Sequence, residues 1–306
     1  MIFSTERLHR EARETLRGLD LVEVGADDHT LGECQVLLTW PSKMDASLLA
    51  KIRNLKAIQT ISAGVDDIDF SLIPPGVRVY SNVGAYSAPA AEHAWALLLA
   101  AAKGIANKGR RAENYLLSGR TLLVLGCGAI GSEVARIGKV AFGMRTVGVS
   151  RSFKAPEAFD SRIPPERLVE ALDGADAIVN SLPLNRQTRL ILSYDALTKM
   201  KDAVVLVNIG RAETIDEVSI GKILEERPRT RFATDVFWRK GGVEDFDSSL
   251  WMLPNFCGTF HTAGGLGAED ALRYAEKRAA ENVRLLLTTG RGENEVDPSD
   301  YGGLRS

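Results

Sequence analysis

A glycine-rich turn near the middle of the chain constrains its fold more than any other feature. Gly126, Gly128 and Gly131 directly follow the apolar run 122–125, and residues 132–140 have the pattern of a helix. A strand, a tight glycine turn and a helix N-terminus together suit a dinucleotide, because the backbone can approach the pyrophosphate and the helix offers free N–H groups. The turn therefore predicts a nucleotide-binding α/β domain that begins well inside the chain.

Strand-like apolar segments follow the turn at short intervals, with helical segments between them. The expected strands are residues 146–149, 177–181, 203–208, 231–234 and 256–259, and the expected helices are 165–172 and 216–225. Near-continuous apolar strands that alternate with helices predict a parallel sheet covered on both faces.

The residues before the turn form a second α/β set. Its expected strands are 21–24, 36–39, 56–60 and 77–80, and its expected helices are 6–16 and 46–51. Long helical patterns at 89–103 and 268–287 enter and leave the nucleotide domain. We therefore expect a dinucleotide-binding domain at 87–267, inserted into a smaller discontinuous domain made of 1–86 and 268–306.

Composition narrows the possible partners and compartments. The net charge of −2 over 306 residues gives no electrostatic support for a nucleic-acid or anionic-membrane partner. Cys34, Cys127 and Cys257 are scattered and lack metal-ligand spacing with a histidine, which favours a reducing compartment without disulfides or a metal site. No secretory signal is evident, and the apolar stretch 94–102 is too short to span a bilayer. We expect a soluble cytoplasmic protein.

Several further motifs follow the predicted strands in a specific order. They are Ser62–Asp66, Ala91–Ala94, Ser181–Leu184, Asn208–Glu217, Thr234–Phe237 and His261–Gly264. Together with the glycine turn they resemble the D-isomer specific 2-hydroxyacid dehydrogenase family over nearly the whole chain. The resemblance implies two doubly wound parallel-sheet domains, with a Rossmann NAD(P)-binding domain inserted into a smaller flavodoxin-like substrate domain. It also implies hydride exchange between a nicotinamide and a small 2-keto or 2-hydroxy acid, as in glyoxylate or hydroxypyruvate reductases.

The resemblance carries roles for individual residues. Arg211 matches the arginine that binds the substrate carboxylate, a task that suits the two parallel N–H groups of a guanidinium. His261 matches the histidine that serves as acid and base. The backbone N–H groups of Ala63, Gly64 and Val65 match a loop that helps to hold the carboxylate, and Asp235 matches an aspartate beside the nicotinamide. Other residues expected at the cofactor are Gly126, Gly128, Ala129, Ile130, Gly131, Leu182, Pro183, Ile209, Gly210 and Gly264.

The chain departs from the family pattern where a glutamate usually pairs with the histidine. Lys240 occupies that position, but the following segment is about two residues longer than usual. Glu244, or with less support Asp245, then folds back toward His261; the alternative is a surface loop with no carboxylate at the histidine. A cofactor-binding sensor or corepressor-like protein with little turnover is the second functional hypothesis, and Lys240 is the feature that supports it.

A second departure concerns the cofactor. An NAD-preferring domain usually carries an acidic residue at the end of the second strand, to bind the adenosine ribose. Here Ser150, Arg151 and Ser152 occupy that region. The loss of the acid and the gain of a base favour NADP(H), with NAD(H) also possible; the alternative is a solvated turn with an incidental arginine.

The helix that begins near Pro89 bears on assembly. Its apolar residues exceed what one buried stripe requires, which favours a homodimer of the kind known in the family; the alternative is burial within one chain. They include Trp95, Leu97, Leu98 and Leu99. His93 lies on the same helix, and we expect a structural role for it.

Overall fold

The computed structural model describes residues 1–105 and 113–302 of the chain. Within them the chain divides into two compact units. The first comprises Met1–Tyr86 and the described residues from Gly267 onward, and the second comprises Ser87–Leu266 without 106–112. The second unit is thus one stretch of chain set between two parts of the first.

A parallel sheet of five strands forms the centre of the first unit. Its strands, in spatial order, are β2 (Leu21–Val22), β1 (Ile2–Ser4), β3 (Val36–Thr39), β4 (Ala57–Thr60) and β5 (Arg78–Tyr80). This 2-1-3-4-5 order is that of flavodoxin-like folds and confirms the predicted architecture. The helices of the unit are α1 (Arg10–Thr15), α2 (Asp28–Gly32), α3 (Ala46–Lys51) and α9 (Glu269–Thr289).

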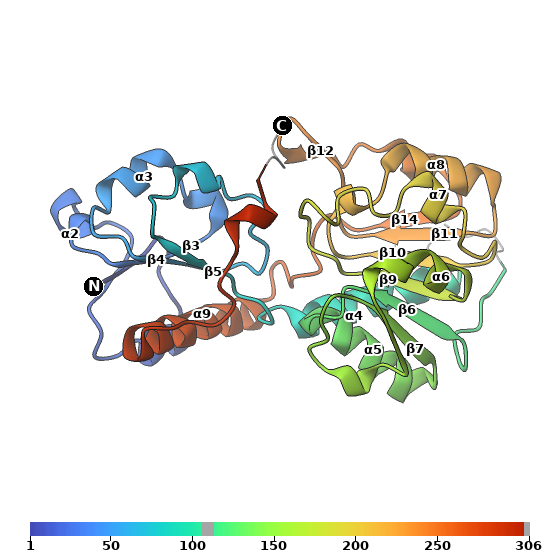
Figure 1. Cartoon of the computed structure of the whole chain (residues 1–306), viewed down its shortest axis with the longest axis horizontal. Helices are drawn as coiled ribbons and strands as arrows, with labels where there is room; N and C mark the ends of the chain where they lie inside the picture. The colour runs from blue at the N-terminus through green and yellow to red at the C-terminus, as the bar shows by residue number, and fades with distance from the viewer. Residues whose placement is uncertain (106–112, 303–306) are drawn as a thin grey trace. The chain divides into compact units, whose positions relative to one another are not determined.

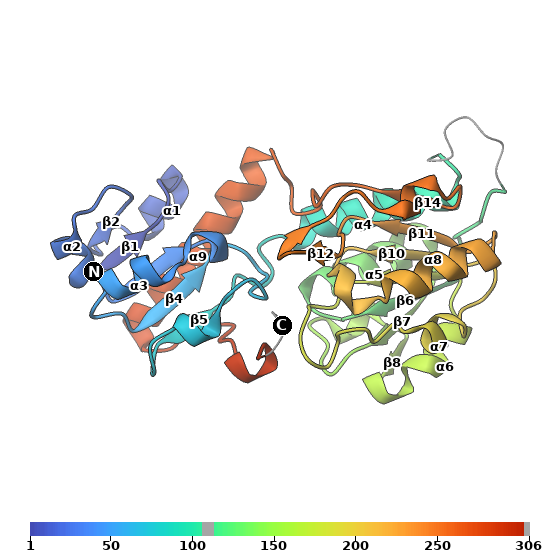
Figure 2. The same cartoon turned by 90° about the horizontal axis from the view of Figure 1, so that it is seen from above.

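Alternating strand residues build two cores on the faces of this sheet. Ile2 and Leu38 pack with residues of α1 and α9, whereas Phe3 and Leu37 pack with residues of α2 and α3. Figure 2 shows α1 beside α9. The chain then returns beyond α9 to lie along β5, where the N–H of Val296 donates to the Val79 carbonyl oxygen at 2.8 Å.

A parallel sheet of seven strands forms the centre of the second unit. Its strands, in spatial order, are β8 (Ser161–Ile163), β7 (Arg145–Val149), β6 (Thr121–Leu125), β9 (Ala177–Asn180), β10 (Val205–Asn208), β11 (Arg231–Thr234) and β14 (Phe256–Gly258). Counted within the unit this is the Rossmann order 3-2-1-4-5-6 with one more strand, as predicted. Its helices are α4 (Ser87–Ala102), α5 (Ala129–Phe142), α6 (Leu168–Asp173), α7 (Tyr194–Leu197) and α8 (Glu217–Glu226).

Helices cover both faces of the larger sheet. Leu122 and Val124 face the core shared with α4 and α5, while Leu123 and Leu125 face the core shared with α6, α7 and α8. Figure 1 shows α4 and α5 on one side of the strands and α7 and α8 on the other. The strands are buried on both faces, which accounts for their nearly continuous apolar sequences.

The sequence patterns missed two strands of these sheets. β1 lies between β2 and β3, and β8 lies at the edge of the larger sheet beside β7. Each has only three residues, β1 stands at the very start of the sequence, and β8 contains Ser161 and Arg162 in place of an apolar run. The first helix begins at Arg10 rather than near residue 6.

The apolar residues of α4 are largely buried within the chain itself. Trp95, Leu97 and Leu98 are at most 6% exposed, and Leu99 is half-buried. Trp95 stacks on Phe142 of α5 with 4.6 Å between ring centroids. The apolar residues do exceed one buried stripe, and α5 and the sheet cover two sides of the helix, so the alternative of burial within one chain accounts for these residues.

Asp176 fastens the N-terminal edge of the larger sheet. Its carboxylate accepts the Thr121 N–H at 2.9 Å and pairs with the Lys201 ammonium at 2.8 Å. Burial opposes ionisation of this group, but the bonds from Lys201 and Thr121 outweigh it and hold the pKa of Asp176 below its ordinary value. A lowered pKa contributes stability above the unfolded-state pKa, and that stability is lost as the pH falls through the folded-state pKa.

We expect Asp176→Asn to lower the free energy of unfolding at neutral pH by about 1.5–3 kcal/mol, the worth of a charged hydrogen bond. The difference from the unsubstituted protein should shrink below about pH 4, where the unfolded carboxyl also binds a proton. Urea unfolding at several pH values measures both effects. An equal difference at every pH would contradict the linkage.

Gly131 sets the distance between α5 and the strand before it. A Cβ at this position would overlap the Gly126 carbonyl oxygen and lie 2.9 Å from Val124 Cγ1. By contrast, a Cβ at Gly128 would meet nothing within 4 Å. Close packing of strand and helix therefore depends on the third glycine of the turn and not on the second.

Gly131→Ala should lower the free energy of unfolding by about 2 kcal/mol, because the backbone it meets cannot move aside. An exposed helical glycine would instead gain about 1 kcal/mol from the same substitution, so the sign is informative. Gly128→Ala is the matched control and should cost less than about 1 kcal/mol, the difference between the two residues at an N-cap. Equal losses in thermal unfolding would refute the contrast.

Candidate active site

Most of the predicted site residues follow the C-terminal ends of strands in the larger sheet. Gly126 follows β6, Leu182 follows β9, Arg211 follows β10 and Asp235 follows β11. All of these strands are parallel, so their C-terminal ends share one edge. Open α/β sheets bind ligands outside this edge, where the strand order reverses, and here the reversal lies between β6 and β9.

The glycine turn lies at that reversal. Gly126 has a left-handed backbone (φ 85°), and a Cβ there would come within 3.1 Å of the backbone at Ser181 and Leu182. Ser181 Oγ lies 2.8 Å from the Gly126 carbonyl oxygen and donates to it. The first turn after β6 thus packs tightly against the first turn after β9.

Gly128 leaves open space at the start of α5. It is the N-cap residue, it is exposed, and it supplies no side-chain cap. The first N–H groups of a helix lack partners within the helix and favour an anion. With Ala129 and Ile130 half-buried beside it, this terminus fits a pyrophosphate group.

The other predicted cofactor residues differ in accessibility. Leu182 is half-buried and Pro183 is exposed, whereas Ile209 is only 7% exposed and belongs to the core shared with α4 and α5. Gly210 has no room for a side chain, because a Cβ would overlap the Leu182 carbonyl oxygen. Ile209 and Gly210 therefore support the site through packing.

The end of β7 carries the expected basic and hydroxyl side chains. Ser150 is half-buried, and Arg151 and Ser152 are exposed. Arg151 Nη1 donates to Gln187 Oε1 at 2.8 Å, which links the β7 turn to the segment after β9. The exposed guanidinium and the two hydroxyls form a polar surface that suits an anion.

Arg211 is held by its backbone as well as by its side chain. Its carbonyl oxygen accepts hydrogen bonds from the Thr214 hydroxyl at 2.7 Å and from Asn208 Nδ2 at 3.2 Å. Its Nη1 donates to the Gly210 carbonyl oxygen at 2.9 Å. The side chain of Arg211, which is half-buried, therefore starts from a firmly held backbone at the edge of the sheet.

A short hairpin follows β11 and supplies a carboxylate to His261. β12 (Arg239–Lys240) pairs antiparallel with β13 (Val243–Glu244) through a two-residue turn. Both turn residues, Gly241 and Gly242, have positive φ values (62° and 83°), which such a turn requires. Gly241 and Gly242 thus form the turn and reverse the chain direction.

The hairpin brings Glu244 to the histidine. Glu244 Oε2 lies 2.5 Å from His261 Nδ1, and Oε1 accepts the Phe237 N–H at 3.0 Å. The Asp245 carboxylate instead pairs with the Lys240 ammonium. The hydrogen bond from Lys240 holds the pKa of Asp245 below its ordinary value. Of the two carboxylates weighed from the sequence, the structure brings Glu244 to His261.

Asp235 organises the loop that carries His261. Its carboxylate is 1% exposed and accepts the N–H groups of Thr262 and Ala263, both at 2.8 Å. The Thr259 hydroxyl donates to the same carboxylate at 2.6 Å. The backbone oxygen of Asp235 accepts the His261 N–H at 2.7 Å. Gly264, at the end of this loop, is half-buried.

His93 has polar partners beyond β11 and β14 that the sequence did not indicate. Its Nε2 lies 2.7 Å from Thr259 Oγ1 and 3.5 Å from Asp235 Oδ1, so it belongs to the same hydrogen-bond network. The motif Ala91–Ala94 was the available signal, but nothing in it indicated Thr259, 166 residues further along the chain, as a partner.

The predicted substrate loop belongs to the first unit. Ala63 and Gly64 are half-buried and Val65 is buried, directly beyond β4. The Ser62 hydroxyl donates to the Gly64 carbonyl oxygen at 2.8 Å and shapes the loop. The N–H groups of these three residues make no hydrogen bond to another backbone group among the described residues.

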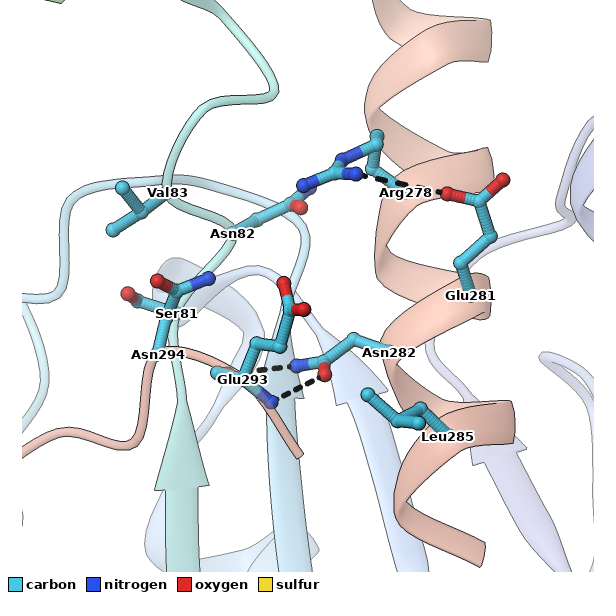
Figure 3. Close-up of a pocket in the computed structure, with 9 residues that line it drawn as sticks. All are labelled: Ser81, Asn82, Val83, Arg278, Glu281, Asn282, Leu285, Glu293 and Asn294. Atoms are coloured by element: carbon cyan, nitrogen blue, oxygen red, sulfur yellow. Dashed lines mark hydrogen bonds and ion pairs between the residues drawn. The ribbon is translucent and has the colours of Figure 1, made fainter. Parts of the chain in front are cut away.

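A polar pocket of about 230 Å³ also lies in the first unit (Figure 3). Its lining includes Arg278 and Glu281 of α9 together with Glu293 and Asn294. Asn282 accepts the Glu293 N–H at 2.7 Å and donates to the Glu293 carbonyl oxygen at 2.9 Å. These bonds tie the segment after α9 to the helix. None of the predicted site residues lines this pocket.

Comparisons with known proteins agree with this arrangement. A family model described as "D-isomer specific 2-hydroxyacid dehydrogenase, NAD binding domain" matches residues 80–263. The D-3-phosphoglycerate dehydrogenase of Methanocaldococcus jannaschii is 31% identical over 97% of this chain, which spans 59% of that relative's length. The hydroxypyruvate reductase of Thermotoga maritima is 29% identical over 90% of this chain and 94% of its own length.

A solved structure extends the likeness to three dimensions. A protein from Pyrobaculum aerophilum, provisionally named as a formate dehydrogenase, matches with a TM-score of 0.85 and 36% identity over 98% of this chain and 99% of its own. Within the described residues, no helix combines the length and apolar character needed to cross a membrane. The family model covers more than half of the chain, and the chain therefore belongs to the D-isomer specific 2-hydroxyacid dehydrogenase family.

Proposed function

We propose that the chain transfers a hydride between a nicotinamide cofactor and C2 of a small 2-keto or 2-hydroxy acid. A glyoxylate- or hydroxypyruvate-type reductase that prefers NADP(H) and can use NAD(H) is the specific form of the proposal. The observation that carries it is the contact between His261 and Glu244, which gives the site an imidazole held by a carboxylate. The similarity to a hydroxypyruvate reductase supports the substrate class.

His261 is the proposed acid and base. The Glu244 carboxylate contacts Nδ1 of the ring. Because a carboxylate only accepts hydrogen bonds, Nδ1 must carry the proton of this bond. Nε2 is then the nitrogen that gives a proton to the substrate oxygen during reduction and takes it back during oxidation. Glu244 thus fixes both the orientation of the ring and the nitrogen that reacts.

Arg211 is the proposed carboxylate-binding residue. A guanidinium matches a carboxylate with two parallel N–H groups, and the rigid backbone of Arg211 limits the entropy lost on binding. The backbone N–H groups of Ala63, Gly64 and Val65 are the substrate-binding groups proposed for the first unit.

The cofactor residues fit a dinucleotide. The open space at Gly128 and the N-terminus of α5 receive the pyrophosphate, and Arg151 with Ser150 and Ser152 receives the 2′-phosphate. When bound, the nicotinamide supplies or accepts the hydride. Asp235 lies beside the nicotinamide in this proposal, and its side chain also shapes the loop of His261.

A homodimer formed through the α4 segment completes the proposal. It rests on the family alone, since Trp95, Leu97 and Leu98 are buried within the chain. The site does not favour the sensor or corepressor-like alternative. Its support was Lys240 in place of a glutamate, and Glu244 now occupies that role in the geometry.

A steady-state screen of 2-keto acids tests the function. Purified protein is assayed with glyoxylate, hydroxypyruvate and pyruvate against NADPH and NADH, following loss of reduced nicotinamide. We expect turnover with at least one acid and a higher kcat/KM with NADPH. Tight NADPH binding without turnover of any acid would refute the enzyme.

Glu244→Gln should lower kcat by about 100-fold, because the amide no longer enforces the productive form of His261. Asp245→Asn is the matched control, since it changes the neighbouring carboxylate that pairs with Lys240, and it should retain most of the activity. Equal kcat values for the two variants would show that Glu244 has no special role.

Arg151→Ala should weaken NADPH binding by about 10- to 100-fold, the worth of one charged hydrogen bond, and leave NADH binding nearly unchanged. Arg145→Ala, which removes an exposed arginine from the opposite end of β7, is the control and should change neither affinity. Calorimetric titration measures both cofactors. Equal losses for NADPH and NADH would exclude a 2′-phosphate contact.

A further inference from the structure

The backbone conformation of His261 has to be held in place by its surroundings. Its φ is 53°, in the left-handed region that costs a residue with a side chain about 1–2 kcal/mol. Three successive N–H groups compensate, because those of His261, Thr262 and Ala263 all donate to Asp235. The direction of the His261 side chain therefore depends on where Asp235 lies.

Asp235 in turn has His93 as a basic neighbour. A carboxylate that is 1% exposed needs hydrogen bonds or a counter-charge to offset its lost hydration. In the described ranges of the chain, the side chain that reaches it as an ion-pair partner is His93, with Nε2 at 3.5 Å. The closer connection runs through Thr259, whose Oγ lies between the two groups.

The Thr259 hydroxyl defines the direction of the hydrogen bonds. A hydroxyl has one proton, and Thr259 donates it to Asp235 Oδ1 at 2.6 Å. Its oxygen can therefore only accept from His93 Nε2 at 2.7 Å, which means that Nε2 carries a hydrogen. His93 thus donates a hydrogen bond to Thr259, and Thr259 donates one to Asp235.

His93 has a rigid support. It projects from α4, where Ala91 and Ala94 are fully buried. Trp95 Nε1 donates to the Val134 carbonyl oxygen at 3.1 Å and joins the helix to α5. Because α4 packs in the core of the unit, it provides a fixed reference for the loop beyond β14.

We infer that His93 and Thr259 are positioning residues that orient His261 through Asp235. In this role they act through Asp235 and need no contact with the substrate or the reacting atoms. The inference rests on the proposed function for its kinetic consequence, but the hydrogen-bond geometry itself does not. Loss of the Thr259 hydroxyl leaves Asp235 with one donor fewer, and the His261 loop then samples other positions.

The first test does not require activity. The chain has only four histidines, so their ring nitrogens can be assigned by nuclear magnetic resonance of ¹⁵N-labelled protein without cofactor. We expect His93 to carry its hydrogen on Nε2, and Thr259→Val to shift the ring resonances of both His93 and His261. A hydrogen on Nδ1 alone in His93, or a His261 signal that Thr259→Val leaves unchanged, would overturn the inference.

The second test is kinetic. Thr259→Val should lower kcat by about 10- to 100-fold with little change in KM for the acid, because misplaced catalytic groups cost that much. Thr259→Ser keeps the hydroxyl and should recover most of the loss. Thr230→Val is the matched control, since it removes a buried hydroxyl bonded to the Asp202 carbonyl oxygen at the opposite end of β11, and kcat should stay unchanged.

The kinetic outcomes separate this inference from the proposed function. If Thr259→Ser is as impaired as Thr259→Val, or if Thr230→Val shows the same loss, then the hydroxyl does not position His261 and the inference fails. If the unsubstituted protein turns over no 2-keto acid, then the proposed function fails, and the resonance experiment alone decides whether the network exists.

Discussion

The candidate site depends on the hydrogen bonds between the Asp235 carboxylate and the loop that carries His261. A buried carboxylate is costly unless its oxygens are hydrogen-bonded, and here the loop beyond β14 supplies the donors. The loop needs the carboxylate equally, because it contains a residue with a left-handed backbone. Neither part is stable in this form without the other, so β11 and β14 together determine where His261 lies.

The hairpin between these strands shows how a family position can change without loss of the contact it served. Lys240 stands where a glutamate is usual, and it pairs with Asp245 rather than with the histidine. Two glycines reverse the chain and return Glu244 to His261. The hairpin thus brings a carboxylate oxygen to His261 Nδ1 from a position four residues beyond Lys240.

The glycine turn combines two opposite steric requirements within six residues. Gly131 has no room for a Cβ, and at Gly126 a Cβ would lie only 3.1 Å from backbone atoms, whereas Gly128 faces open space. Tight packing at the outer two brings strand, turn and helix together. The open middle position then leaves the N-terminus of α5 accessible to an anion. Glycines close together in the sequence thus provide both the tight packing of the turn and the access of an anion to the N-terminus of α5.

The sequence alone determined the fold class, most strands and the residue types of the site. Buried parallel strands leave apolar runs that can be recognised, and the motifs after them keep their order along the chain. The edge strand β8 leaves no such run, because Ser161 and Arg162 are polar. Only the tertiary structure decided that Glu244 rather than Asp245 meets His261, that α4 buries its apolar residues within the chain, and that His93 joins Asp235. These outcomes depend on contacts between side chains from segments far apart in the sequence. Local sequence patterns do not show which of these side chains come into contact.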